Sequence, residues 1–143
     1  MPVTYLTATK NNRLSMAFLA AAVTPAAGQS VDSGAGVGTL VIGTSALSGA
    51  TGVLATIALQ KPSVSIAGGV ATILGVPLSA NATATGVAAK AELRDSAGNV
   101  IVSGLTVGGT AEGTNAGKDI VLNASTISTG ETVILNSGSI THG

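Results

Sequence analysis

The side chains in this sequence that could perform acid–base or nucleophilic chemistry are few and widely separated. The 143-residue chain has no Cys and a single His, His142, which is the penultimate residue. A hydrolase or transferase site usually needs a nucleophile, a base and an orienting group that converge, with His, Asp or Glu among them. The spacing here contains no recognisable set of this kind, so we expect no catalytic residues and no enzyme activity.

Two pairs of oxygen-bearing side chains have spacings that could be considered for Ca²⁺. Asp95 and Asn99 bracket a glycine-containing turn, and Asp119 and Asn123 bracket a short apolar run. Neither pair has the repeated Asp/Asn pattern of calcium loops, whereas both residue types stabilise ordinary turns. We therefore expect turn chemistry at both places and no metal site.

A glycine-rich segment, Gly34-Ala35-Gly36-Val37-Gly38, resembles part of the dinucleotide-binding fingerprint. That fingerprint requires a strand before the glycines and a helix after them. Here a Ser/Gly-rich loop comes first and an apparent strand follows. We reject a nucleotide site and expect no cofactor.

The composition favours β-strands and a surface that is packed against neighbours. The chain has 20 Gly, one Tyr, one Phe and no Trp, and small and β-branched residues dominate it. Only 8% of the residues are charged and the formal net charge is zero, against about 25% charged residues in an ordinary domain. Such a surface suits self-association, as a dimer or a trimer. The lack of Lys/Arg runs and of aromatic residues argues against nucleic acid as a partner.

From residue 34 onward, short apolar runs alternate with turn residues at intervals of about 8 to 12 residues, the rhythm of a sandwich or barrel. The predicted strands are Thr39–Ile42, Val53–Leu59, Val64–Ile66, Val70–Leu74, Val87–Arg94, Val100–Leu105, Asp119–Leu122, Thr132–Leu135 and Ser139–Thr141. Gly68-Gly69 and Asp95–Asn99 predict hairpins, because Gly and Asn tolerate positive φ. We predict an all-β domain, an antiparallel β-sandwich or jelly roll, over residues 29–143.

The predicted strand Val87–Arg94 has the clearest alternation. One face would carry Val87, Ala89, Ala91 and Leu93, and the other would carry Ala88, Lys90, Glu92 and Arg94. We expect the first set to enter the core and the second to face water or a partner. The charges near the hairpin either protect the strand from edge pairing, which is the default, or make a contact at the rim of an interface.

Residues 1–28 are predicted to form an N-terminal arm with a short helix. Its apolar stripe is Leu14, Ala17, Phe18 and Ala21, with Asn11 or Asn12 as the cap and Pro25 and Gly28 as the stop. The stretch Lys10–Gly28 also has the outline of a secretory signal peptide. Because its apolar run is short and rich in Ala, we favour the helical arm.

The arm contains the side chains that we expect to contact a neighbouring molecule. Large apolar residues are scarce and the only Phe lies here, so Leu14, Met16 and Phe18 are the predicted anchors. Lys10 and Arg13 lie near the helix start, where positive charge does not help the macrodipole, which suggests a contact, although solvation is the simpler interpretation. The alternative for the anchors is a helix that covers one end of its own sandwich.

The C-terminal half resembles a group of small proteins of tailed bacteriophages. The resemblance is carried by Thr85-Gly86, Ala91-Glu92-Leu93-Arg94-Asp95-Ser96-Ala97-Gly98, Gly104-Leu105-Thr106-Val107-Gly108, Asp119-Ile120-Val121-Leu122-Asn123, Thr126-Ile127-Ser128-Thr129-Gly130-Glu131-Thr132-Val133 and Ser139-Ile140-Thr141. These proteins commonly carry segments similar to LRDSSGN and GLTVG, and an ending similar to DIVLN…ITxGxTV…ITH. The resemblance supplies no site motif.

Within this group the chain most resembles capsid cement, or decoration, proteins, which are β-sandwich or jelly-roll domains that bridge capsid subunits on the outer shell. The resemblance implies a virion protein on the outer capsid surface. Its partners would be the major capsid protein and further copies of itself, with no nucleic acid or membrane. A tail, neck or fibre component is the alternative, and a secreted bacterial adhesive β-domain is the third possibility. The insertion Gly109–Gly117 and the arm depart from the family pattern.

Overall fold

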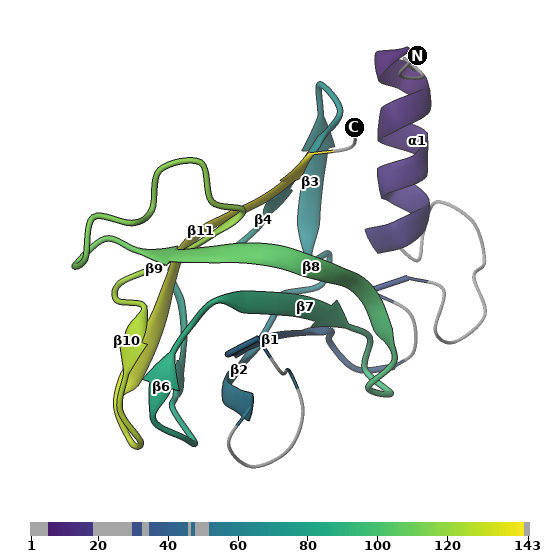
Figure 1. The fold of residues 1–143 in the computed structure, drawn as a ribbon. Coiled ribbons are helices and arrows are strands. Elements are labelled where there is room, and N and C mark those ends of the chain that lie inside the picture. Colours follow the sequence, from purple (N-terminus) through teal and green to yellow (C-terminus); the bar gives the residue numbers. More distant parts are fainter. Residues whose placement is uncertain (1–5, 19–29, 33–34, 46, 48–51, 142–143) are drawn as a thin grey trace.

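The computed structural model describes residues 6–18, 30–32, 35–45, 47 and 52–141, which contain one helix and eleven strands (Figure 1). The helix is α1 (Thr7–Phe18). The strands are β1 (Thr39–Gly43), β2 (Val53–Ala58), β3 (Val64–Ala67), β4 (Val70–Ile73), β5 (Leu78–Asn81), β6 (Gly86–Val87), β7 (Lys90–Arg94), β8 (Val100–Gly109), β9 (Ile120–Leu122), β10 (Thr126–Ile127) and β11 (Thr132–Thr141). The predicted all-β class with a short N-terminal helix is confirmed.

Nine strands form one curled, mixed sheet, so the predicted antiparallel sandwich or jelly roll is not confirmed. The strand order is β2-β1-β7-β8-β9-β11-β4-β3, and β5 also pairs with β11. The pair β8–β9 is parallel, and the other described pairs are antiparallel. The sheet curls until β2 lies beside β5, and just after β5 the Thr83 N–H donates to the Leu54 carbonyl of β2 at 2.8 Å. The short strands β6 and β10 form a separate two-stranded sheet.

Both predicted hairpins form, and their turns use the residues expected. Gly68 and Gly69 join β3 to β4 with φ angles of 61° and 79°, a region that glycine enters at little cost. In the turn between β7 and β8, Asp95 Oδ1 accepts the N–H groups of Ala97 and Asn99 at 3.0 and 2.9 Å. This is the turn chemistry expected for the pair Asp95 and Asn99.

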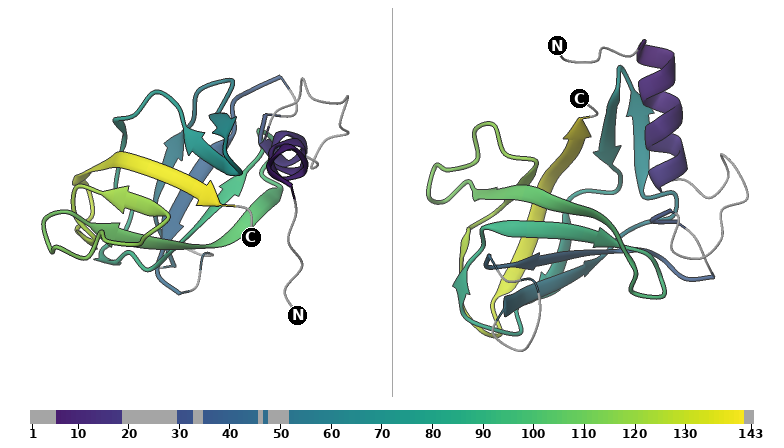
Figure 2. Two further views of the ribbon diagram at one scale, coloured as in Figure 1. Left: turned by 90° about the horizontal axis from the view of Figure 1, so that it is seen from above. Right: turned by 45° about the vertical axis from the view of Figure 1, so that its right-hand side comes forward.

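The hydrophobic core combines the inner face of the curled sheet with one face of α1. Leu14 and Phe18 of α1 are 4% and 1% exposed and belong to the same buried cluster as the strand residues. Burial of side chains of this size contributes about 1.5–3 kcal/mol each. The helix is therefore an integral part of the packed domain, and it runs beside the β3–β4 hairpin (Figures 1 and 2).

A short segment after α1 ties the end of the helix to the sheet. The N–H groups of Val31 and Asp32 donate to the carbonyls of Ala17 and Phe18, both at 2.9 Å, and so satisfy two C-terminal carbonyls of the helix. Asp32 Oδ2 in turn accepts the N–H of Ser63, just before β3, at 3.0 Å. The helix end and the hairpin start thus share one connection.

The helix begins at Thr7 and not at Asn11 or Asn12 as predicted. Asn11 lies inside the helix, and its Oδ1 accepts the backbone N–H of Gly69 at 2.8 Å, at the turn of the β3–β4 hairpin. The side chain that we expected to cap the helix therefore joins the helix to the sheet.

Asn11→Ala is expected to lower the free energy of unfolding by about 1–2 kcal/mol, because it leaves the buried N–H of Gly69 without its acceptor. Urea denaturation measures the change. The matched control is Asn136→Ala, at an exposed position of β11, where the expected change is within about 0.5 kcal/mol. Equal effects at the two positions would contradict a specific role for the bond to Gly69.

The predicted strand Val87–Arg94 is in fact two strands, β6 and β7. Between them the N–H groups of Ala88 and Ala89 donate to the carbonyls of Ser125 and Gly43, at 2.8 and 2.9 Å, so the chain passes from one sheet to the other. As a result the side chain of Ala88 is buried and those of its two neighbours are exposed, the reverse of the predicted alternation. The alternation holds only from Ala91 onward, and even there the outward residue Glu92 is buried.

Other strand limits also differ from the prediction. The predicted strands Thr132–Leu135 and Ser139–Thr141 are one ten-residue strand, β11, which pairs with β4, β5 and β9. Strand β8 continues to Gly109, and β5 and β10 were not predicted. The predicted helix stop at Pro25 and Gly28 and the predicted domain boundary after residue 28 lie outside the described residues.

Candidate functional site

The outward side of β1, β7 and β8 gathers charged side chains with two exposed valines. In β7, Ala91 and Leu93 point into the core, so the alternate residues of the strand point outward. The β1 and β8 residues opposite them share this side of the sheet. We call this surface the outer face and define it by Val37, Thr39, Lys90, Glu92, Arg94, Val100 and Lys118.

Glu92 and Arg94 form an ion pair at the centre of the outer face. Arg94 Nε donates to Glu92 Oε1 at 2.7 Å, and Nη2 donates both to that oxygen and to the Leu47 carbonyl, the latter at 3.3 Å. The side chains are 10% exposed for Glu92 and 28% for Arg94. The default interpretation of these charges as protection of an edge strand is wrong, because β7 is a central strand between β1 and β8.

Exposed valines flank Arg94 at the hairpin end of the outer face. Val100 is directly opposite Arg94 in β8 and is 49% exposed. Val37 is 40% exposed, and its neighbour Gly38 lies so close to the Arg94 carbonyl that an added Cβ would be 2.8 Å from that oxygen. Arginine is enriched in protein–protein contacts and among the residues that contribute most to their affinity.

Two lysines extend the outer face along β8. Lys90 is opposite Thr106, and Lys118 lies over Gly108, where an added Cβ would be 2.8 Å from its Cγ. Thr106 and Gly108 are two positions apart on the same side of the strand, which separates the two lysines by about 7 Å along β8. Both lysines are exposed and fit within one partner's footprint of about 800 Å².

The predicted contact residues of the arm belong to α1 and are not part of the outer face. Leu14 and Phe18 are buried in the core of their own chain, which is the second of the two alternatives for these anchors. The half-buried Lys10 lies beside Gly69, where an added Cβ would be 3.1 Å from its Cδ. The side chains of Arg13 and Met16 lie outside the described part of the structure. Contacts of Lys10, Arg13 and Met16 with a neighbouring molecule stay predictions.

Asp119 and Asn123 join strands and do not make the turn bonds that we expected for them. Asp119 Oδ2 accepts both the N–H and the hydroxyl of Thr106 at 3.0 Å, and Asn123 Oδ1 accepts the N–H of Ile134 at 3.0 Å. These bonds link β8, β9 and β11. Among the described residues, no group of three or more His, Cys, Asp or Glu side chains could hold a metal ion. His142 lies outside the described residues.

Glu112 ties the loop after β8 to β10. Its Oε1 accepts the N–H of Ser125 at 2.9 Å and its Oε2 accepts the N–H of Thr126 at 3.1 Å. These two bonds, that of Ser125 first, hold the pKa of Glu112 below its ordinary value of 4.5. Because the ionised form makes the bonds, their contribution to stability is present above pH 4.5 and is lost as the pH falls through the lowered pKa.

Glu112→Gln is therefore expected to weaken this tie at neutral pH, since a neutral amide is a weaker acceptor and presents an N–H to one of the two donors. Amide hydrogen exchange of Ser125 and Thr126 should be faster in the variant than in the wild type. The difference in unfolding midpoint between the two proteins should shrink as the pH is lowered below 4.5. A difference that does not change with pH would show that the charge of Glu112 has no part in it.

Within the described residues, no helix is long and apolar enough to cross a lipid bilayer. No protein-family model, curated protein or solved structure matches this chain. The role of the outer face is accordingly inferred from its own chemistry.

Proposed function

We propose that this chain is a non-enzymatic bacteriophage capsid cement protein, which binds the outer shell of the capsid and stabilises it by bridging major capsid subunits. The sequence resemblance to tailed-phage proteins supports the phage context. The low content of charged residues, 8%, supports a protein whose surface is normally packed against other proteins.

The observation that carries the binding role is that the side chain of Arg94 is already held in a fixed position on the outer face. Its guanidinium is fixed by Glu92 and by the Leu47 carbonyl before any partner arrives, and Val100, opposite Arg94 in β8, is exposed. A side chain that is already ordered loses little entropy on binding, which leaves more of the contact energy as affinity.

On a capsid, many copies of the protein would together resist the internal pressure. A cement protein adds contacts across subunit junctions, so that internal pressure must break those contacts as well as the bonds of the shell. Each contact can be modest, because a copy that touches two subunits gains from the high effective concentration of the second site. The small outer face fits such repeated, modest contacts.

Imaging of purified virions that contain this chain, at a resolution that shows side chains, tests the proposal. Density for the curled sheet on the outer shell, with the outer face against capsid subunits, is the expected result. Density confined to the tail, neck or fibre would replace the proposal with another structural role in the virion. Absence of the chain from virions would refute both, and secretion of the chain by bacteria would favour the adhesive domain.

A further inference from the structure

The acidic side chains of this chain are all used within the fold. The six carboxylates accept hydrogen bonds from the chain itself, Glu92 from Arg94 and the other five from backbone N–H groups. The five are Asp32, Asp95, Glu112, Asp119 and Glu131. A carboxylate bound to fixed donors has fewer free lone pairs to offer to a partner.

Three of the four lysines are used differently, whereas Lys61 donates to the Gly36 carbonyl at 3.3 Å. Among the described side chains, Lys10, Lys90 and Lys118 make no hydrogen bond or ion pair with the chain. Each ammonium group therefore presents its three N–H donors to solvent. Two of these lysines, Lys90 and Lys118, lie on the outer face.

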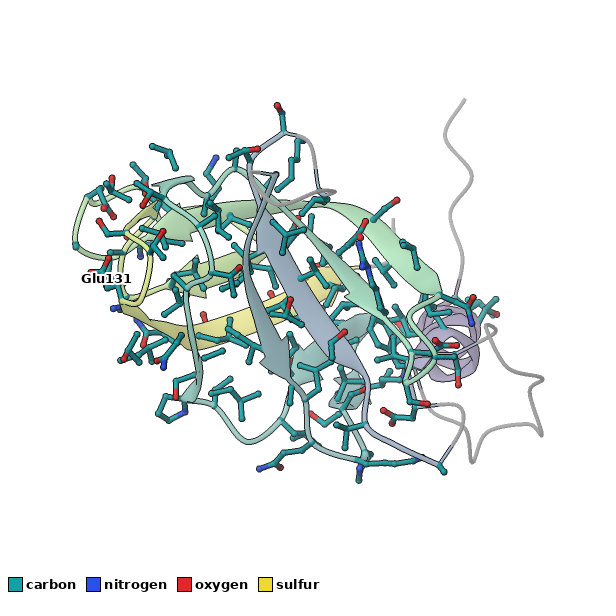
Figure 3. All side chains as sticks on the ribbon, turned by 90° about the horizontal axis from the view of Figure 1, so that it is seen from below. Glu131 is labelled. Carbon is teal, nitrogen blue, oxygen red and sulfur yellow. The ribbon has the colours of Figure 1, made fainter. Side chains whose placement is uncertain are left out.

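The fold places Lys118 and the exposed carboxylate of Glu112 on opposite sides of β8. An added Cβ at Gly108 would meet Lys118, and one at the adjacent Gly109 would meet Glu112 Oε1. Because successive residues of a strand point to opposite sides, Glu112 and Lys118 lie on opposite sides of β8. The other exposed carboxylate, Glu131, lies in the turn between β10 and β11, at the end of the molecule opposite α1 (Figure 3), where it accepts the N–H of Ser128.

The charges that remain on the outer face are therefore mainly positive. Arg94 neutralises Glu92, and Asp119, which is half-buried, is bound to Thr106. We infer that the outer face docks on a carboxylate-rich protein surface of the particle, with Lys90 and Lys118 facing acidic side chains and Val37 and Val100 making apolar contact. This inference rests on the proposed function and names the chemistry of the partner.

Binding to capsids that lack the chain tests the inference directly. The wild type, the double variant Lys90→Gln/Lys118→Gln and the control Lys10→Gln are mixed with such capsids, and the bound fraction is measured by sedimentation. An exposed ion pair changes affinity by up to about fivefold, so the double variant should bind about two- to twentyfold more weakly. The control, on α1, should bind like the wild type. Equal binding by the double variant would overturn the inference while leaving the cement role intact.

Salt provides a second reading of the same contact. Raising the ionic strength from about 0.01 M to about 0.15 M shortens the screening length from about 30 Å to about 8 Å. Wild-type binding should fall over this range, and the double variant should respond less. Binding that does not change with salt would assign the contact to apolar groups and overturn the inference.

A carboxylate probe separates failure of the inference from failure of the proposed function. At low salt the wild type, although its formal net charge is zero, should be retained on immobilised polyglutamate and not on polylysine, and the double variant should elute earlier. Retention together with no binding to capsids would refute the cement role alone. No retention, or equal retention of the double variant, would refute the inference.

A second copy of the chain is the competing occupant, because Glu112 and Glu131 are also exposed. Self-association in sedimentation equilibrium that is weakened both by the lysine double variant and by Glu112→Gln/Glu131→Gln would assign the outer face to that copy. This result would overturn the inference of a partner from the particle. Self-association that neither variant changes would show that the copies associate through another surface, and the inference of a partner from the particle would stand.

Discussion

Phe18→Ala is expected to lower the free energy of unfolding by about 3–5 kcal/mol. Phe18 is 1% exposed, is the only Phe, and joins α1 to the core of the sheet. Its removal deletes buried apolar area and leaves a cavity in the core. Urea or thermal unfolding of the purified chain, followed by circular dichroism, measures the change.

The same measurement decides between the two alternatives for the helix. If Phe18 anchored the chain on a neighbouring molecule, Phe18→Ala would weaken binding and leave the unfolding of the isolated chain unchanged. Because a small domain has only about 5–15 kcal/mol of stability, the variant could be largely unfolded. The milder Phe18→Leu, expected to cost about 1–1.5 kcal/mol, then provides the quantitative comparison. Leu6→Ala, at a side chain that is 79% exposed, is the matched control and should change stability by less than about 0.5 kcal/mol.

Arg94→Met is expected to cost about 2–3 kcal/mol. It keeps most of the apolar part of the side chain but leaves the carboxylate of Glu92, whose side chain is 10% exposed, without its partner. Removing one member of a fully buried pair costs about 3–5 kcal/mol, and the partial exposure of Arg94 reduces this because solvent screens the remaining charge. Urea denaturation at neutral pH measures the loss.

A double-mutant cycle isolates the pair from the rest of the change. In Arg94→Met/Glu92→Gln no charge is left unpaired, so the double variant should recover about half or more of the lost stability. Equal stability of the single and double variants would show that Arg94 acts through its bond to the Leu47 carbonyl alone. Under the proposed function, capsid binding of the double variant should still be reduced, because the fixed guanidinium is gone from the outer face although its net charge is unchanged.

The local parts of the fold could be predicted from the sequence, and the parts that depend on distant partners could not. Gly68-Gly69 and Asp95–Asn99 specify their turns through φ and side-chain bonds within a few residues, and both hairpins are confirmed. The break at Ala88 and Ala89 depends on bonds to the Gly43 and Ser125 carbonyls, far away in the sequence. Alternation alone cannot reveal such a change of sheet.

The candidate site divides in the same way. The alternation around Ala91 and Leu93 correctly placed Arg94 on the outward side, but it gave no sign that Glu92 would be buried there and paired with Arg94. The helical stripe was correctly identified at Leu14 and Phe18, yet periodicity shows only that a face is apolar and not which molecule covers it. Lys118 was missed because its position over Gly108 follows from the course of a long loop.

The pairing of β11 also bears on how the chain is made. Strand β5 pairs with β11, while β4 and β9 each need it as their second partner. During translation these strands therefore lack their β11 partner until Thr132–Thr141 has left the ribosome. Until then their unpaired backbone edges are open to pairing with other chains. The pairs β4–β11 and β5–β11 join residues far apart in the sequence, and such contacts form slowly. Nascent chains should thus be most vulnerable to aggregation just before the sheet is completed, and co-translational chaperones should bind them at that stage.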